Sequence, residues 1–301
     1  IKELNEQANK LWHTSNYLAN EPAINLAKKL TDLTFAEKVY FSNSGSEANE
    51  AAIKIARKFH HDRGENRDEI ISFENSFHGR SLLNISLGGT DKHKIGFGPL
   101  ISGVKHAKYN DISSVESLIS NKTAAIIIEP VQGEAGVYEV NQAFLKSLRE
   151  LCDENGTLLI MDEVQSGVGR MGYLFGYMKY DIEPDILTSA KGLGGGMPIG
   201  ATLTKNNIAP SLSTGTHGST FGGNPIACAV SNKVLQIVPA SWWDLGLCAQ
   251  HRSVGLGVLR CKFLHTFLLK AGWPAPSRVW RASSDVHAML WLQVAPPWSV
   301  Y

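Results

Sequence analysis

The chain has 301 residues, of which 43% are hydrophobic and 19% are charged, and its formal net charge at pH 7 is +1. This balance is typical of a globular enzyme and excludes a disordered or fibrous chain. Lysine and arginine gather into no block and no apolar stretch is long enough for a transmembrane helix, so we expect neither nucleic acid nor a membrane as a partner. The scattered cysteines predict neither a metal site nor a disulfide framework.

Helix patterns begin near the start of the chain. A helix that opens at Pro22 carries apolar residues at Ile24, Ala27, Leu30 and Leu33. The other predicted helices cover residues 1–11, 47–59 and 142–151.

Short apolar runs between these helices predict strands. They occupy residues 39–41, 70–73, 124–128, 158–161 and 186–187. The alternation of strand and helix indicates an α/β domain with a mostly parallel sheet that helices cover on both faces. Ligands of such folds bind at the carboxyl ends of the strands, so the loops that follow the strands are the candidate site.

The composition changes near Val238. From there to Tyr301 the chain holds six of its seven tryptophans and five of its twelve prolines, but only two aspartates and no glutamate. We therefore expect a large domain at residues 1–237 and an atypical tail at residues 238–301. The tail is a different domain, a disordered extension, or a translation artefact such as a frameshift or a misjoined exon, and we favour the artefact.

Two polar residues follow neighbouring strands. Asp162 ends the strand at residues 158–161, and Lys191 precedes a glycine run after the next strand. Each has an ordinary explanation alone, since an aspartate often caps a turn and a lysine before glycines is often a solvated loop residue. Together they match pyridoxal phosphate, which needs a lysine for a Schiff base and a carboxylate to keep its ring nitrogen protonated. The freed lysine amine is then placed to shuttle the substrate proton.

A phosphate site is predicted at residues 42–50, where a strand feeds a glycine-containing turn and then a helix. Free amides and the positive helix end would face an anion there, although a plain serine-rich helix cap explains the same pattern. The loop at residues 217–225 offers a second phosphate contact or is a plain loop. The nucleotide-type phosphate loop is absent from the sequence.

Further candidates follow the other strands. Phe77 is an aromatic that can stack on a pyridine ring, and Arg80 can grip a substrate carboxylate with two hydrogen bonds. His78 between them suggests a general base, but we favour a structural role for it. Glu129 and Glu134 follow the strand at residues 124–128.

These motifs together resemble the class III pyridoxal-phosphate-dependent aminotransferases, and within them the acetylornithine aminotransferases of the fungal, mitochondrial type. The resemblance runs from residue 1 to about residue 237. It is carried by residues 43–50, 77–80, 158–200 and 217–220. The implied fold is that of the aspartate-aminotransferase-like, fold type I enzymes.

The resemblance implies a role for each candidate residue. By similarity Lys191 binds the cofactor covalently and Asp162 pairs with its ring nitrogen. Gln165 would bond the ring hydroxyl, with Val164 and Phe77 on the two faces of the ring. Gly45 and Ser46 would hold the phosphate, and Thr220 would reach the phosphate of a neighbouring subunit, which implies a homodimer with shared sites. The implied substrate contacts are Arg80, Glu129, Glu134 and Ser219, with the two glutamates bonding Gln165 and gating a second arginine.

The implied reaction moves the δ-amino group of N2-acetylornithine to 2-oxoglutarate, a step of arginine synthesis. Ornithine or another ω-amino acid remains an alternative donor, and a truncated, non-catalytic cofactor-binding product is the alternative from another class. The resemblance implies the mitochondrial matrix, or the cytoplasm for a bacterial protein.

Two departures from the family bear on activity. The family begins some tens of residues before Ile1, and its small C-terminal domain, which carries the second arginine, does not resemble residues 238–301. We therefore expect a complete cofactor site, an incomplete substrate site and poor transamination by this chain alone.

Overall fold

The computed structural model describes residues 1–15 and 18–238, which all belong to one compact unit, Ile1–Leu245. Apart from Val238, the predicted tail lies outside the described residues. The division of the chain at residue 237 therefore stays a prediction.

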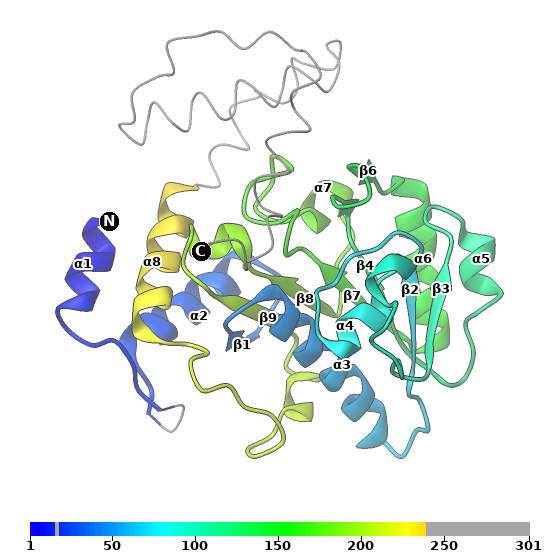
Figure 1. The fold of residues 1–301 in the computed structure, drawn as a ribbon, viewed down its shortest axis with the longest axis horizontal. Helices are drawn as coiled ribbons and strands as arrows, with labels where there is room; N and C mark the ends of the chain where they lie inside the picture. The colour runs from blue at the N-terminus through cyan, green and yellow to red at the C-terminus, as the bar shows by residue number, and fades with distance from the viewer. Residues whose placement is uncertain (16–17, 239–301) are drawn as a thin grey trace, which may run out of the picture. The chain divides into compact units, whose positions relative to one another are not determined.

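A mostly parallel sheet lies at the centre of the described part (Figure 1). Its strands are β1 (Lys38–Ser42), β2 (Glu69–Phe73), β3 (Val104–Ala107), β4 (Thr123–Ile128), β7 (Leu158–Asp162), β8 (Ile186–Ser189) and β9 (Gly200–Thr204). They are ordered β1-β9-β8-β7-β4-β2-β3, and β9 runs against the others. The predicted α/β fold with a mostly parallel sheet is confirmed. A small hairpin of β5 (Val131–Gln132) and β6 (Tyr138–Glu139) stands apart from this sheet.

Helices cover both faces of the sheet (Figure 1). The α-helices are α1 (Lys2–Ala8), α2 (Glu21–Leu33), α3 (Gly45–His61), α4 (Leu82–Leu87), α5 (Ile112–Glu116), α6 (Gln142–Asn155), α7 (Tyr177–Tyr180) and α8 (Pro225–Ile237). Three short 3-10 helices in the same part of the chain are η1 (Asp91–His93), η2 (Lys191–Gly194) and η3 (Ala209–Ser211).

Side-chain alternation along the strands divides the core into two layers. On β4, Ile126 and Ile128 pack in the layer that includes α2, α6 and α8, whereas Ile127 packs in the layer formed by α3. The two layers arise because successive side chains of a strand point to opposite faces. Burial on both faces is why the central strands read as continuous apolar runs in the sequence.

The helix starts follow from their caps. Asn20 accepts a hydrogen bond from the Ala23 amide and Pro22 lies in the first turn of α2. Ser44 caps α3 and Asn141 caps α6 in the same way. These side chains satisfy amides that have no partner within the helix.

Helix α2 buries only part of the apolar stripe predicted for it. Leu26 and Leu30 are fully buried, but Ile24 is 56% exposed and Leu33 is 37% exposed. The core-facing stripe is set by packing against α8 and β1, which turns Ile24 and Leu33 outward in this chain. Single-sequence periodicity identified the helix but not the rotation about its axis.

Two strands of the sheet, β3 and β9, carry no clear apolar run. The sequences Val-Lys-His-Ala and Gly-Ala-Thr-Leu-Thr are short and partly polar, so their β-structure depends on pairing with β2 and with β1 and β8. Among the described residues no helix has the length and apolar character needed to cross a bilayer.

Candidate active site

A cavity of about 370 Å³ lies where strands β7 and β8 end and helix α3 begins. It is lined by Asn43, Ser44, Gly45, Ser46, Asn49, Phe77, His78, Gly79, Glu129, Asp162, Val164, Gln165, Ala190, Lys191, Gly196, Met197, Pro198 and Ile199. The position is the expected one, at the carboxyl ends of parallel strands. Most of the predicted cofactor residues therefore meet at one place, although they come from distant parts of the sequence.

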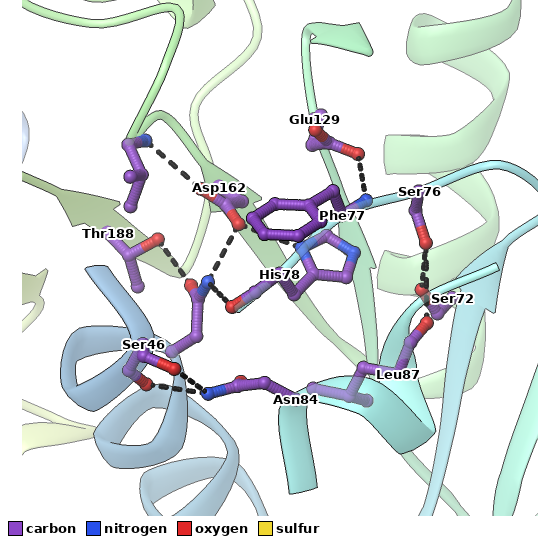
Figure 2. A network of polar contacts seen from close by, with 12 residues as sticks. Ser46, Ser72, Ser76, Phe77, His78, Asn84, Leu87, Glu129, Asp162 and Thr188 are labelled. Carbon is purple, nitrogen blue, oxygen red and sulfur yellow. Dashed lines mark hydrogen bonds and ion pairs between the residues drawn. The ribbon is translucent and has the colours of Figure 1, made fainter. Parts of the chain in front are cut away.

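Asp162 is the last residue of β7 and is 4% exposed (Figure 2). Its Oδ2 accepts hydrogen bonds from Asn49 Nδ2 and His78 Nδ1, both at 2.8 Å. Its Oδ1 accepts one from the Val164 amide at 3.0 Å. These donors stabilise the negative charge of the carboxylate inside the protein, where an unpaired charge would be costly.

His78 is buried and its ring is hydrogen-bonded to Asp162. Burial acts to lower the pKa of His78, but the hydrogen bond and the charge of Asp162, helped by Glu129, outweigh it and raise the pKa. In the described part of the chain His78 Nε2 is buried without a hydrogen-bond partner. The imidazole therefore serves to hold the Asp162 carboxylate. This agrees with the structural role that we favour for His78 over that of a general base.

Lys191 begins η2, with Ala190 between it and β8, and lines the cavity from an exposed position. Its φ of 41° lies in the left-handed region, which is uncommon for a residue with a side chain. The neighbouring Val168 also has a positive φ, 55°, and would lie 3.2 Å from a Cβ added to Gly192. Strained backbone of this kind gathers at functional sites, where the surrounding structure holds it.

The first turn of α3 forms another wall of the cavity. Ser44 Oγ accepts a hydrogen bond from the Glu47 amide at 3.2 Å, and the helix begins at Gly45. Amides of a first turn have no carbonyl partner within the helix, so they are available to an anion. A Cβ on Gly45 would lie 2.5 Å from Val164 Cγ1, so only glycine allows this close approach.

Phe77 and Val164 both line the cavity, as expected for residues that enclose a flat ring. The Phe77 amide donates to Glu129 Oε2 at 3.0 Å. Burial raises the pKa of Glu129 above its usual range, with the charge of Asp162 acting in the same direction. Glu129 thus contacts the Phe77 backbone, whereas the resemblance implied a bond to Gln165.

Gln165 lines the cavity and its Nε2 donates to Glu134 Oε1 at 3.2 Å. For Glu134 the resemblance implied a second arginine as partner, whereas the structure places it against Gln165. A Cβ on Gly133 would lie 1.3 Å from Gln165 Oε1, so this side chain passes directly against the backbone of the loop. Glu134 itself is exposed.

Four predicted residues lie outside the cavity lining, namely Arg80, Glu134, Ser219 and Thr220. Arg80 is exposed, and its guanidinium carbon lies 5.3 Å from the centre of the Phe77 ring. Ser219 Oγ accepts from Asn43 Nδ2 at 3.0 Å, so its loop is tied to the cavity edge. Thr220 is exposed.

Two polar residues of the site were missed in the sequence. Asn49 lines the cavity from α3, and Thr188 on β8 bonds it. Asn49 lies within the segment 42–50 predicted to hold a phosphate, and Thr188 lies at the end of a predicted strand, but the sequence indicated no contact between them. No cluster of potential metal ligands occurs within residues 1–15 and 18–238.

A family model described as aminotransferase class-III matches residues 1–252. The chain belongs to this family. Residues from three of the four segments that carried the resemblance, 43–50, 77–80 and 158–200, line the cavity.

Curated relatives agree with the family. The chain is 54% identical over 252 residues to an acetylornithine aminotransferase of Pseudomonas putida, covering 83% of this chain and 62% of that protein. It is 55% identical over 249 residues to a succinylornithine transaminase of Salmonella newport, covering 82% and 61%. The chain therefore spans about three fifths of the length of these relatives. Both are bacterial, and the fungal type stays a prediction.

Solved structures share the fold. An N-acetylornithine aminotransferase from Stenotrophomonas maltophilia has a TM-score of 0.69 and 36% identity, over 90% of this chain and 65% of that one. An ornithine aminotransferase from Toxoplasma gondii has a TM-score of 0.76 and 34% identity, over 79% and 57%. An amine transaminase from an uncultivated Pseudomonas species, described in its PLP-bound form, has a TM-score of 0.77 and 31% identity, over 89% and 67%.

Class-III aminotransferases depend on pyridoxal phosphate, and the cavity fits this cofactor. It offers a stabilised carboxylate on Asp162, an amine on Lys191 and the amino end of α3 for a phosphate. Phe77 and Val164 supply apolar walls for a ring. This donor set matches the parts of the cofactor one by one.

Proposed function

We propose that this chain carries the cofactor site of an aminotransferase that moves the δ-amino group of N2-acetylornithine to 2-oxoglutarate, giving N-acetylglutamate 5-semialdehyde and glutamate. The observation that carries the proposal is the convergence of Asp162, Lys191 and the amino end of α3 on one cavity. The reaction would serve arginine biosynthesis.

The residues of the cavity divide the chemistry among them. When bound, pyridoxal phosphate supplies a carbonyl that captures amines and a ring that accepts electrons. Lys191 would bind that carbonyl carbon and later hold and move a proton at its Nζ. Asp162 would keep a proton on the ring nitrogen through its charge, and the α3 amides would hold the phosphate.

An N2-acylated ornithine is supported as donor by the names of the relatives. Acetylornithine and succinylornithine enzymes are equally similar to the chain, at 54% and 55% identity. Both donors present the same δ-amine and differ only in the acyl group. The ornithine aminotransferase structure, at 34% identity, supports plain ornithine less well.

The dimer and the location are part of the proposal. Thr220 is exposed and outside the cavity of its own chain, as a residue that serves a neighbouring subunit would be. Ser219 would reach the substrate from the same loop. We propose the mitochondrial matrix as the location, by resemblance alone.

A second candidate function is non-catalytic cofactor binding. It is favoured by the surroundings of Glu134, for which the resemblance implied a second arginine. Glu134 contacts Gln165 and forms no ion pair with an arginine within residues 1–15 and 18–238. Under this alternative the chain would bind pyridoxal phosphate but leave amines unchanged.

Borohydride trapping tests the proposed function. The full chain is incubated with pyridoxal phosphate, reduced, digested and analysed by mass spectrometry. We expect the reduced adduct on Lys191, its loss in Lys191→Ala, and its retention in Lys146→Ala, which removes an exposed lysine of α6. An adduct of equal yield in Lys191→Ala would contradict the assignment.

The same preparation separates the two candidate functions. Stoichiometric formation of semialdehyde from N2-acetylornithine supports the aminotransferase. Under the same reading, adding that amine before reduction lowers the yield of the Lys191 adduct. A Lys191 adduct whose yield is unchanged by acetylornithine, succinylornithine and ornithine supports the non-catalytic binder.

A further inference from the structure

A chain of polar side chains reaches Asp162 through the core between α3 and β8 (Figure 2). Thr188 Oγ1 donates to Asn49 Oδ1 at 2.7 Å, and Asn49 Nδ2 donates to Asp162 Oδ2 at 2.8 Å. Thr188 is 0% exposed and Asn49 is 1% exposed. A buried amide and a buried hydroxyl are costly unless they are hydrogen-bonded, so each needs the other.

The chemistry of the partners fixes the orientation of the Asn49 amide. Its nitrogen faces Asp162 Oδ2 and the His78 carbonyl oxygen, both at 2.8 Å, and neither of those atoms can donate. Its oxygen must then face Thr188, whose hydroxyl can donate. A flipped amide would bring its oxygen against two acceptors, so Asp162 and the His78 carbonyl select the orientation and the Thr188 hydroxyl satisfies the amide oxygen that results.

The same contacts determine which oxygen of Asp162 stays available. A carboxylate oxygen accepts about two hydrogen bonds along its lone pairs. Oδ2 receives Asn49 and His78, whereas Oδ1 receives the Val164 amide. The remaining acceptor position of this buried group is therefore on Oδ1.

We propose that Thr188 and Asn49 are positioning residues that saturate Asp162 Oδ2 and so direct Oδ1 to the ring nitrogen of the cofactor. The inference rests on the proposed function, since it concerns the cofactor of that same site. Neither residue touches the reacting atoms through this relay: Thr188 acts on Asn49, and Asn49 acts on the carboxylate.

A purely structural role is the alternative, because the same hydrogen bonds also join α3 to β8. The two roles differ in what they do to the ring nitrogen. A structural defect weakens every ligand of the cavity alike. A positioning defect weakens only a ligand that has the nitrogen.

The test uses the full chain and two ligands, pyridoxal phosphate and its carbocyclic analogue, in which a C–H group replaces the ring nitrogen. Dissociation constants for both are measured by equilibrium dialysis. Thr188→Val removes the hydroxyl while keeping the branched shape, and Thr188→Ser keeps the hydroxyl. Apo-protein unfolding in urea is recorded for each variant.

We expect Thr188→Val to weaken pyridoxal phosphate binding by about fivefold to tenfold, the effect of one hydrogen bond, and to leave analogue binding within about twofold. Thr188→Ser should keep the wild-type ratio of the two constants. Equal weakening of both ligands in Thr188→Val, or an unchanged ratio, would overturn the proposal. If Thr188→Val does not fold, Asn49→Ala is measured instead. A wild-type ratio of the two dissociation constants in Asn49→Ala would likewise overturn the proposal.

Failure of the proposed function would give a different binding result from failure of the relay. A wild-type chain that binds neither ligand contradicts the cofactor site itself. A wild-type chain that prefers pyridoxal phosphate, with variants that keep the preference, contradicts only the relay.

Discussion

Buried carboxyl groups dominate the site at the scale of single residues. Asp162 and Glu163 are adjacent in the sequence, yet their side chains serve different parts of the structure. Glu163 is fully buried and accepts hydrogen bonds from the amides of Gly176 and Tyr177 and from the Ser166 hydroxyl. It thereby holds the loop that carries Val164 and Gln165, whereas Asp162 faces the cavity.

Glu163 makes stability depend on pH. Burial raises its pKa from 4.5 to about 7, because the charged form loses hydration that its hydrogen bonds only partly replace. Between these two values the folded chain keeps the proton and the unfolded chain loses it. Rising pH therefore favours unfolding, by at most about 1.4 kcal/mol per pH unit from this group.

We expect Glu163→Gln to flatten the fall in unfolding free energy between pH 5 and about pH 7, since glutamine does not titrate. Urea unfolding at a series of pH values measures it. Glu150→Gln makes the same chemical change on the exposed side of α6 and should keep the wild-type slope. Identical slopes in wild type and Glu163→Gln would show that burial does not act on this carboxyl as described.

Helix α3 is the element that joins fold and site. Its carboxyl-terminal part fills one core layer through Ile53, Ile55 and Phe59, and its first turn lines the cavity. The Ser44 cap serves both purposes, because it fixes where the helix begins and which amides stay available. Loss of this cap should therefore affect stability and phosphate binding together.

We expect Ser44→Ala to lower the unfolding free energy by about 1 kcal/mol and also to weaken pyridoxal phosphate binding. Asn141→Ala removes the equivalent cap of α6, which is not part of the cavity lining. It should lower stability by a similar amount and leave the dissociation constant unchanged. Urea unfolding without cofactor measures the stability, and equilibrium dialysis measures the dissociation constant. Equal dissociation constants for the two variants would show that the Ser44 cap does not contribute to cofactor binding.

The elements differ in how far the sequence could specify them. Helices α3 and α6 were predictable because caps and apolar spacing agree, and β4 and β7 because buried parallel strands are continuous apolar runs. Strand β9 was missed, since Gly-Ala-Thr-Leu-Thr has little β-pattern without its neighbours. The rotation of α2 depended on packing against α8, which no local pattern contains.

The site was predictable only in part for a related reason. Asp162 and Lys191 follow strands, and strand ends meet at one edge of a parallel sheet. Asn49 and Thr188 act through one hydrogen bond across 139 positions of the chain, which sequence spacing cannot reveal. The contact of Glu129 with the Phe77 amide likewise needed the fold.

The open question at the scale of the whole molecule is whether one chain completes a site. Every predicted cofactor residue except Thr220 lines the cavity of its own chain. Thr220 lies on a loop tied to Asn43 through Ser219 and is exposed. This placement leads us to expect that it serves the cavity of a second copy.

Mixed dimers test this expectation directly. Chains with Lys191→Ala and chains with Thr220→Ala are co-expressed with different tags, and the hybrid is purified by both. If Thr220 acts across subunits, the site that keeps Lys191 receives an intact Thr220 from its partner, and the hybrid should bind and trap pyridoxal phosphate with wild-type affinity at about half of its sites. If Thr220 acts within its own chain, no site of the hybrid is intact and the affinity should equal that of the Thr220→Ala dimer. Light scattering establishes the dimer before either result is interpreted, and a monomer with full affinity would contradict the shared site.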